Sequence, residues 1–260
     1  MSRPALPVVD VVILTWNDNP ALLDAAVTSA LAQVGVDPRI TVIDNGSTPP
    51  AVVVVDHRVR LVRSEENLGV GGGRNRGVRE TDAPLVCFLD SDARLHPDTL
   101  ARLVAPLTDD ATVGLTAPVF TGQAPEASAG RAPTLWRKIA RGLNRTDVYE
   151  RTPGQGRDEH SEVDFAIGAC QVFRRTAFDA VGGLDASAAF GPEDVDFCLR
   201  VRGAGYRVLQ VANARCDHPP RRAFKGLATA RGLRHGIAVV RHLWRHKRTR
   251  PVREVGEVVA

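Results

Sequence analysis

The chain has 260 residues, of which 43% are hydrophobic, so it can bury one large core or two small ones and is expected to be globular. Its formal net charge is +4, but it carries no zinc-finger spacing, aromatic RNA-binding motif or basic zipper, and we expect no nucleic acid partner. No apolar stretch approaches the ~20 residues that cross a bilayer, which argues against a membrane-spanning protein.

The cysteines and the first residues bear on the compartment. None of the four cysteines stands in a C-x-x-C spacing, which favours a reduced setting. The start, MSRPALPVVD, is too short and too interrupted by proline for a signal peptide. We therefore expect a cytoplasmic protein, with peripheral contact at the inner face of the cell membrane as an open alternative.

Apolar runs and helical spacing alternate through the first half of the chain. Asn19 and Pro20 are expected as N-cap and first-turn residues of the first helix, and Gly35 as its end. The pattern predicts these elements in order: strand 8–16, helix 19–33, strand 39–44, strand 59–64, helix 71–81, strand 85–90, helix 96–107 and strand 112–120. Such alternation predicts an α/β sandwich with a parallel sheet and right-handed crossovers.

Polar side chains recur where these strands end, namely Thr15, Asn17, Asp44, Asp90 and Asp92. Open parallel sheets bind ligands at the carboxyl edge of their strands, so this recurrence predicts a nucleotide-sized site there. The alternative is that each residue only begins a loop or caps a helix.

The glycine-rich run NLGVGGGRNRG does not match the common nucleotide fingerprints. A G-x-G-x-x-G reading from Gly69 meets Arg74 where the third glycine belongs, and the chain has no Gly-Lys-Ser or Gly-Lys-Thr of a phosphate-binding P-loop. We expect these glycines to allow close packing, while Arg74 and Arg76 offer charge to phosphates. A helix packed tightly through small residues is the alternative.

Two carboxylates follow the most apolar strand, in the stretch LVCFLDSDARL. Asp90 and Asp92, separated by the small Ser91, can face one hard cation from a rigid base. Magnesium or manganese suits these oxygen ligands and would hold the pyrophosphate of a nucleotide-linked substrate. The position after a buried strand is more specific than the D-x-D spacing by itself.

Taken in order, five segments make the chain resemble the inverting glycosyltransferases of family 2, and most of all their rhamnosyltransferase-like branch. The segments, spread over residues 8–218, are VVILTWND, VIDNGS, NLGVGGGRNRG, FLDSDARL and GACQVFRRTAFDAVGGLDASAAFGPEDVDFCLRVRGAGYRV. The resemblance implies a Rossmann-like α/β/α sandwich of the glycosyltransferase-A type, with a mixed central sheet and a helical C-terminal extension.

The resemblance also implies roles for residues around the nucleotide and the metal. Asp92 would be the direct ligand of Mn²⁺ or Mg²⁺ and His218, in CDHPP, a second protein ligand, whereas Asp90 would contact ribose or a metal-bound water. Without the family context, a histidine before two prolines is usually a loop residue. The stretch from Thr15 to Asp18, together with Asp44, would hold the base and ribose. The residues expected to bind the nucleoside-diphosphate sugar are Thr15, Asn17, Asp44, Asn67, Gly69, Arg74, Asp90 and Ser91.

An acidic helix start in the second half carries the expected catalyst. Glu193, Asp194 and Asp196 fall in the first turn of a predicted helix, where the helix dipole favours acidic residues without any catalytic role. By the resemblance, Asp194 is the general base that takes the proton of an acceptor hydroxyl, in a single displacement that inverts the anomeric carbon. Further candidates for the site are Glu193, Asp164 and Gly168, and a retaining reaction would need a nucleophile such as Asp164 or Glu162.

We expect a catalytic domain over residues 1–220, with a nucleotide-binding half at 1–120 and an acceptor-binding, catalytic half at 160–220. Residues 122–160 are expected as a lid that faces the acceptor, with disorder as the alternative. Residues 221–260 are expected as basic helices that pack on the domain or, alternatively, contact an anionic membrane surface.

The expected function is transfer of a sugar from a nucleotide-linked donor, such as dTDP-rhamnose or a UDP-hexose, to a hydroxyl of a glycan, lipid-linked glycan or natural product. One alternative is a non-catalytic nucleotide-sugar-binding protein. Another is a sugar nucleotidyltransferase, which the stretch TWNDNP disfavours because a glycine-rich basic loop would be expected there. The sequence does not select the donor, the acceptor, the divalent metal or the oligomeric state.

Overall fold

Strands and helices alternate along the chain as the sequence predicts. A computed structural model describes residues 5–122, 127–130, 160–187 and 193–219. The elements are β1 (Val8–Thr15), α1 (Pro20–Leu31), β2 (Asp37–Asp44), β3 (Val59–Arg63), α2 (Gly69–Arg79), β4 (Leu85–Asp90), β5 (Arg94–Leu95), α3 (Thr99–Asp109), β6 (Val113–Thr121), β7 (Ala129–Gly130), β8 (His160–Glu162), β9 (Phe165–Ala166), β10 (Cys170–Arg174), α5 (Arg175–Ala180), α6 (Glu193–Gly203) and β11 (Arg207–Asp217).

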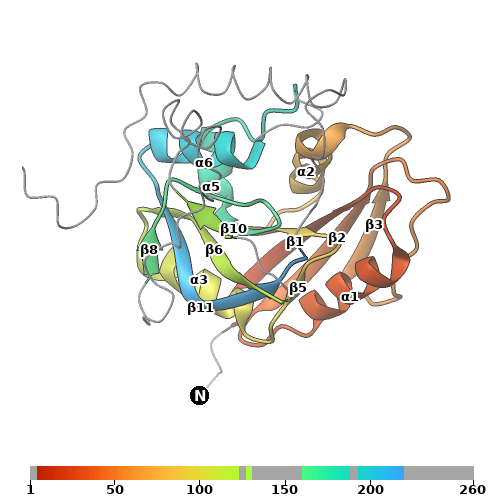
Figure 1. Cartoon of the computed structure of the whole chain (residues 1–260), viewed down its shortest axis with the longest axis horizontal. Coiled ribbons are helices and arrows are strands. Elements are labelled where there is room, and N and C mark those ends of the chain that lie inside the picture. The colour runs from red at the N-terminus through yellow and green to blue at the C-terminus, as the bar shows by residue number, and fades with distance from the viewer. Residues whose placement is uncertain (1–4, 123–126, 131–159, 188–192, 220–260) are drawn as a thin grey trace, which may run out of the picture.

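Within the described ranges, nine strands form one mixed sheet (Figure 1). Its main path runs β3-β2-β1-β4-β10-β6-β11-β5, with β8 paired to β11. Strands β3, β2, β1 and β4 are parallel, β10 runs antiparallel between β4 and β6, and β11 is parallel to β6. The predicted mixed sheet is confirmed, and the insertion of β10 places both halves of the chain in one sheet.

Apolar side chains project from both faces of the sheet and form two buried layers. Val9, Val11 and Ile13 of β1 belong to a cluster with residues of α1 and α3, whereas Val12 joins a cluster with residues of α2, α5 and α6. Side chains alternate along a strand, so neighbouring positions serve opposite layers. Figure 1 shows α1 and α3 on one face of the sheet and α2, α5 and α6 on the other, which is the predicted α/β/α sandwich.

The strand register collects the polar strand ends at one edge. Leu14 of β1 pairs with Asp90 of β4, and Thr15 pairs with Asp44 of β2. Strand β11 runs parallel to β6 and ends at Asp217, one residue before His218. Residues more than 120 positions apart in sequence therefore meet at the carboxyl edge of the sheet, and these strand ends are the base of the candidate site.

The first helix begins as predicted but ends earlier. Asn19 accepts a hydrogen bond from the backbone N–H of Ala21 at 3.0 Å and Pro20 follows it, so the cap is confirmed. The helix ends at Leu31, so the prediction that Gly35 ends it is wrong. Gly35 lies in the following turn with a φ of 78°, a left-handed conformation that glycine adopts without a Cβ penalty.

Two predicted regions, the lid over residues 122–160 and the basic extension over 221–260, lie almost wholly outside the described residues. The catalytic domain boundary at residue 220 likewise remains a prediction. Among the helices that the structure describes, none is both long enough and apolar enough to span a bilayer.

Candidate active site

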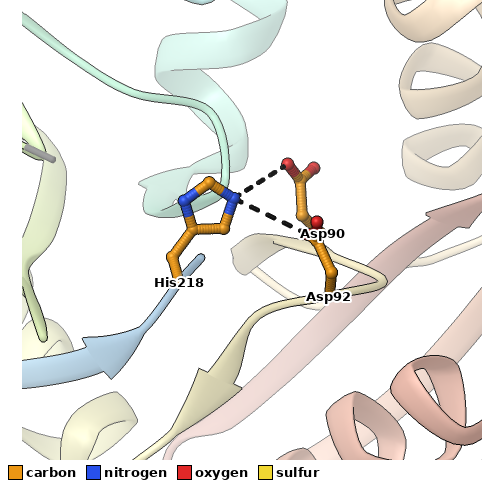
Figure 2. A group of neighbouring side chains, drawn as sticks. All are labelled: Asp90, Asp92 and His218. Atoms are coloured by element: carbon orange, nitrogen blue, oxygen red, sulfur yellow. Dashed lines mark ion pairs between the residues drawn. The ribbon is translucent and has the colours of Figure 1, made fainter. Parts of the chain in front are cut away.

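The end of β4 and the end of β11 bring two carboxylates and an imidazole together (Figure 2). His218 Nε2 lies 3.6 Å from Asp92 Oδ1 and 3.9 Å from Asp90 Oδ2, and the candidate ligand atoms all lie within 4.8 Å of one another. His218 is only 5% exposed and packs on Phe120, with ring centroids 5.1 Å apart. Within the described ranges, neither ring nitrogen of His218 has a hydrogen-bond partner.

The surroundings of His218 fit a divalent cation. A buried imidazole is costly to leave without partners, and its nitrogen faces two carboxylates at distances too long for hydrogen bonds. Carboxylate oxygens with one imidazole nitrogen are a suitable ligand set for Mg²⁺ or Mn²⁺. The three residues fit a metal centre, and the ligand roles that the resemblance implies for Asp92 and His218 stay predictions.

Asp18 connects the end of β1 with the turn that carries Asp90 and Asp92. Its Oδ2 accepts hydrogen bonds from Ser91 Oγ at 2.5 Å, from Thr15 Oγ1 at 3.1 Å and from the backbone N–H of Trp16 at 3.3 Å. The expected donor-binding residues Thr15 and Ser91 thus meet through Asp18, which belongs to the stretch 15–18 expected beside the base and ribose.

Asp44 is fully buried, and its carboxylate is occupied by the chain itself. It accepts hydrogen bonds from the backbone N–H groups of Ser47 at 2.8 Å and Ala51 at 3.0 Å, and from Arg63 Nη1 at 2.5 Å. Burial opposes ionisation, but the bonds from Ser47 and Ala51 and the charge of Arg63 hold the pKa of Asp44 below its usual value. Asp44 therefore shapes the loop after β2.

Asn17 and Asn67 shape neighbouring loops in the same way. Asn17, with a φ of 53°, accepts a hydrogen bond from the backbone N–H of Thr48 at 2.7 Å. Asn67 Oδ1 accepts from Asn45 Nδ2 at 2.9 Å and from the backbone N–H of Gly69 at 2.8 Å. These bonds fix the loops after β1 and β2 and the entry to α2, where Gly69 has a φ of 72°.

Arg74 of α2 is buried and joins the two halves of the site. Its Nη2 donates to Asp90 Oδ1 at 2.6 Å and to the carbonyl oxygen of Gly168 at 2.7 Å, and its Nη1 lies 3.5 Å from Glu193 Oε1. The guanidinium also stacks over Phe88, 5.3 Å from the ring centroid. Arg74 thereby links the D-x-D turn to the start of α6, and the predicted phosphate contact stays a prediction.

Asp194 lies at the start of α6 beside this arginine. Its Oδ2 accepts the backbone N–H of Gly168 at 3.0 Å and its Oδ1 that of Val195 at 2.7 Å. Burial raises the pKa of Asp194, although both backbone hydrogen bonds and Arg74 oppose that rise. Burial and the charge of Asp194 also raise the pKa of Glu193 to about 8, against the opposing effect of Arg74.

The raised pKa of Glu193 gives a testable pH dependence. Between about pH 4.5 and 8 the unfolded chain releases the Glu193 proton while the folded chain keeps it, so this group's contribution to the free energy of unfolding falls as pH rises. Glu193→Gln has no proton to lose there. We expect the unfolding free energy of the variant, minus that of the parent, to increase steadily across this window in urea titrations. A pH-independent difference would contradict the raised pKa.

The structure places Asp164 in a different set of contacts. It is fully buried and forms an ion pair with Arg202 Nη1 at 2.6 Å. Glu162 pairs with Arg207 at 3.0 Å. Within the described residues, the carboxylates and imidazole that lie together as candidate metal ligands are Asp90, Asp92 and His218, whereas the candidate Gly168 bonds both Arg74 and Asp194.

The structure is thus an α/β protein with a mixed sheet and a candidate cation site at the carboxyl ends of its strands, the edge where open parallel sheets bind ligands. The chain belongs to the family "Glycosyl transferase family 2", whose model matches residues 10–182. It is 37% identical over 111 residues to "Succinoglycan biosynthesis protein ExoO" of Rhizobium meliloti (strain 1021), an alignment that covers 40% of this chain and 32% of that protein. The chain spans about a third or less of the first curated relatives that it matches.

Two solved structures share the fold. One, described as "GalNAc-T7 with UDP, GalNAc and Mn2+", has a TM-score of 0.66 and 19% identity, covering 92% of this chain and 48% of that one. The other, a mannosyltransferase from Pyrobaculum calidifontis "in complex with GDP-Man and Mn2+", has a TM-score of 0.63 and 18% identity, covering 94% and 65%. The fold is thus of the glycosyltransferase-A type.

Proposed function

We propose that the protein is a metal-dependent glycosyltransferase that moves a sugar from a nucleoside-diphosphate donor to an acceptor hydroxyl. The observation that carries this proposal is the convergence of Asp90, Asp92 and His218 at the carboxyl edge of the sheet. The family membership and the two neighbours solved with nucleotides or nucleotide sugars and Mn²⁺ support it.

In this proposal Asp92 and His218 hold Mn²⁺ or Mg²⁺, and Asp90 contacts ribose or a metal-bound water. When bound, the cation neutralises charge that develops on the departing diphosphate. Trp16, 43% exposed at the end of buried β1, offers its ring for stacking on the base. The hydrogen bonds around Asp18, Asp44 and Asn67 hold the donor-binding loops, and the proposed donor-binding set stays Thr15, Asn17, Asp44, Asn67, Gly69, Arg74, Asp90 and Ser91.

Asp194 is the proposed general base. As the acceptor oxygen attacks the anomeric carbon, its proton passes to an Asp194 carboxylate oxygen, and the bond from that carbon to the diphosphate breaks with the electron pair leaving on the diphosphate. A single displacement of this kind inverts the anomeric carbon. The pKa of Asp194, raised by burial, makes its carboxylate a better proton acceptor than an exposed aspartate. The N–H of Gly168, whose carbonyl oxygen is bound by Arg74, keeps the Asp194 carboxylate oriented.

The finer assignments remain proposals. The rhamnosyltransferase-like motifs favour dTDP-rhamnose as donor, with a UDP-hexose as the alternative, and the acceptor is a hydroxyl of a glycan, lipid-linked glycan or natural product. The relative named for succinoglycan biosynthesis supports a polysaccharide acceptor. A cytoplasmic site of action, with peripheral membrane contact through the basic residues 221–260, is part of the same proposal.

A donor screen tests the function. The full chain is incubated with uridine-, thymidine- and guanosine-linked sugars, with Mn²⁺, with Mg²⁺ or with a chelator, and thermal stability and donor hydrolysis are followed. We expect one donor class to stabilise the protein and to be slowly hydrolysed only when metal is present. If donors bind but are never cleaved or transferred, the chain is a nucleotide-sugar-binding protein; if none binds, the proposed site is wrong.

A further inference from the structure

The glycine-rich helix α2 has contacts that the proposed donor site does not explain. A Cβ on Gly71 would lie 2.8 Å from the carbonyl oxygen of Asp185, and one on Gly72 would meet Leu68 and Ala186. The absence of side chains therefore lets residues 185–186 lie directly against α2. Leu14 of β1 contacts the opposite side of the helix at Gly73. Helix α2 thus separates β1 from the chain that leads toward α6.

Asn75 binds this chain through both ends of its amide. Its Nδ2 donates to the carbonyl oxygen of Leu184 at 2.8 Å, and its Oδ1 accepts the backbone N–H of Leu184 at 2.8 Å. These two hydrogen bonds resemble the paired N–H and C=O bonds between neighbouring β-strands, but they join a helix side chain to a loop backbone. Gly183, with a φ of 77°, comes so close that an added Cβ would lie 2.9 Å from Asn75 Oδ1.

Arg200 of α6 holds the same loop from the other side. Its Nη1 donates to the carbonyl oxygens of Val181 and Gly183, both at 2.7 Å, while its Nε donates to Asp196 Oδ2 at 2.6 Å. The loop at 181–184 is therefore bonded to α2 through Asn75 and to α6 through Arg200. Four hydrogen bonds to main-chain groups hold it in place between the two helices.

A second set of contacts joins α2 to the start of α6. The neighbouring residue Arg74 contacts Glu193, the first residue of α6, and the carbonyl oxygen of Gly168, whose N–H donates to Asp194. Helix α2 consequently touches the start of α6 directly through Arg74 and the loop before it through Asn75.

We propose that Asn75 is a positioning residue for the transfer step, which holds α6 so that Asp194 faces the D-x-D turn. This inference rests on the proposed function. Asn75 contacts neither the candidate metal ligands nor the proposed base, so it acts on Asp194 through the loop and α6. A displacement of about 1 Å in a reacting group can cost roughly 100-fold in rate, so removing the two bonds should affect turnover more than donor binding.

The test compares Asn75→Ala, Asn75→Asp and a matched control, Gln33→Ala, in the full chain. Gln33 is also an amide that uses both ends: its Nε2 donates to the carbonyl oxygens of Ser29 at 3.1 Å and His96 at 2.7 Å, and its Oε1 accepts the N–H of Leu100 in α3 at 2.8 Å. Binding of UDP with Mn²⁺, steady-state hydrolysis of the donor found in the screen, and hydrogen exchange of residues 193–203 are measured for each. Asn75→Ala and Gln33→Ala each remove the bonds made by both ends of an amide, whereas Asn75→Asp removes only the donor to the Leu184 carbonyl oxygen.

For Asn75→Ala we expect kcat to fall by roughly 10- to 100-fold with little change in donor KM or in UDP affinity, and faster exchange at the start of α6. Asn75→Asp, which still accepts the Leu184 N–H, should show an intermediate loss of kcat. If Asn75→Ala does not fold, the kcat of Asn75→Asp tests the proposal instead. Gln33→Ala should lose stability but keep kcat.

A kcat loss in the Asn75 variants no greater than in Gln33→Ala overturns the proposal, as does a loss confined to KM. If the parent chain cleaves no donor, the proposed function is wrong, and a role of Asn75 in the transfer step is wrong as well. The exchange data then show separately whether Asn75 holds α6.

Discussion

We expect Asp194→Asn to lower the rate of sugar transfer by about 10²–10⁴-fold, the usual contribution of a general base. The physical reason is that an amide cannot accept the acceptor's proton, while its carbonyl oxygen can still accept the Gly168 N–H that the Asp194 carboxylate binds now. Donor affinity should change little, because the substitution leaves Asp90, Asp92 and His218 intact. Initial rates of transfer, together with UDP titrations in Mn²⁺, measure the two effects separately.

Asp10→Asn is the matched control for this variant. Asp10 is also a buried aspartate that accepts two backbone N–H groups, those of Asp82 at 2.9 Å and Ala83 at 2.6 Å, but it lies near the start of β1, away from the strand ends. Both variants should lose stability, and only Asp194→Asn should lose transfer. Equal activity of Asp194→Asn and the parent would remove Asp194 as the base.

The second large effect is expected at the metal ligands. His218→Ala and Asp92→Asn should each weaken Mn²⁺-dependent UDP binding by at least about 10- to 100-fold, the range found when only the residues that orient a metal ligand are changed. The cause is the loss of one of two proposed protein ligands in a site where His218 Nε2 lies 3.6 Å from Asp92 Oδ1. Calorimetric titration of UDP at fixed Mn²⁺ is the measurement.

Binding of UDP in the presence of a chelator separates a metal effect from damage to the fold. The parent chain with chelator and the two variants with Mn²⁺ should then bind UDP equally weakly. His57→Ala is the control histidine, because its side chain is 90% exposed and it lies in the loop before β3. Retained metal-dependent UDP binding in His218→Ala would mean that the imidazole is not a ligand.

The part of the site that follows from local sequence was predictable. Asp90 and Asp92 stand directly after an unbroken apolar run, so burial of that run in a parallel sheet places them at the edge of the sheet. The acidic first turn of α6 was equally readable from its spacing. In both cases, the residues that determine where the acidic side chains lie are their neighbours in the sequence.

The remaining contacts depend on pairings that local sequence does not encode. Antiparallel β10 inserts between β4 and β6, and this brings Gly168 to Arg74. From the sequence, Arg74 is predicted to bind phosphate because it stands in a glycine-rich run. In the structure its guanidinium is buried between Asp90 and Glu193. Asp18 is expected near the base and ribose, but its bond to Ser91 is not, because that bond spans 73 positions. The two-residue period of side chains along a strand predicts which face of the strand is buried. It does not predict which strand lies next to it in the sheet.

Manganese anomalous scattering tests the central claim most directly. Crystals of the full chain are soaked with Mn²⁺ and UDP, and anomalous difference maps are calculated from data collected near the manganese absorption edge. The account predicts a peak within coordination distance, about 2.0–2.6 Å, of an Asp92 oxygen and of His218 Nε2, with the UDP phosphates beside it. A peak elsewhere, or ordered UDP with no manganese between these side chains, would contradict it.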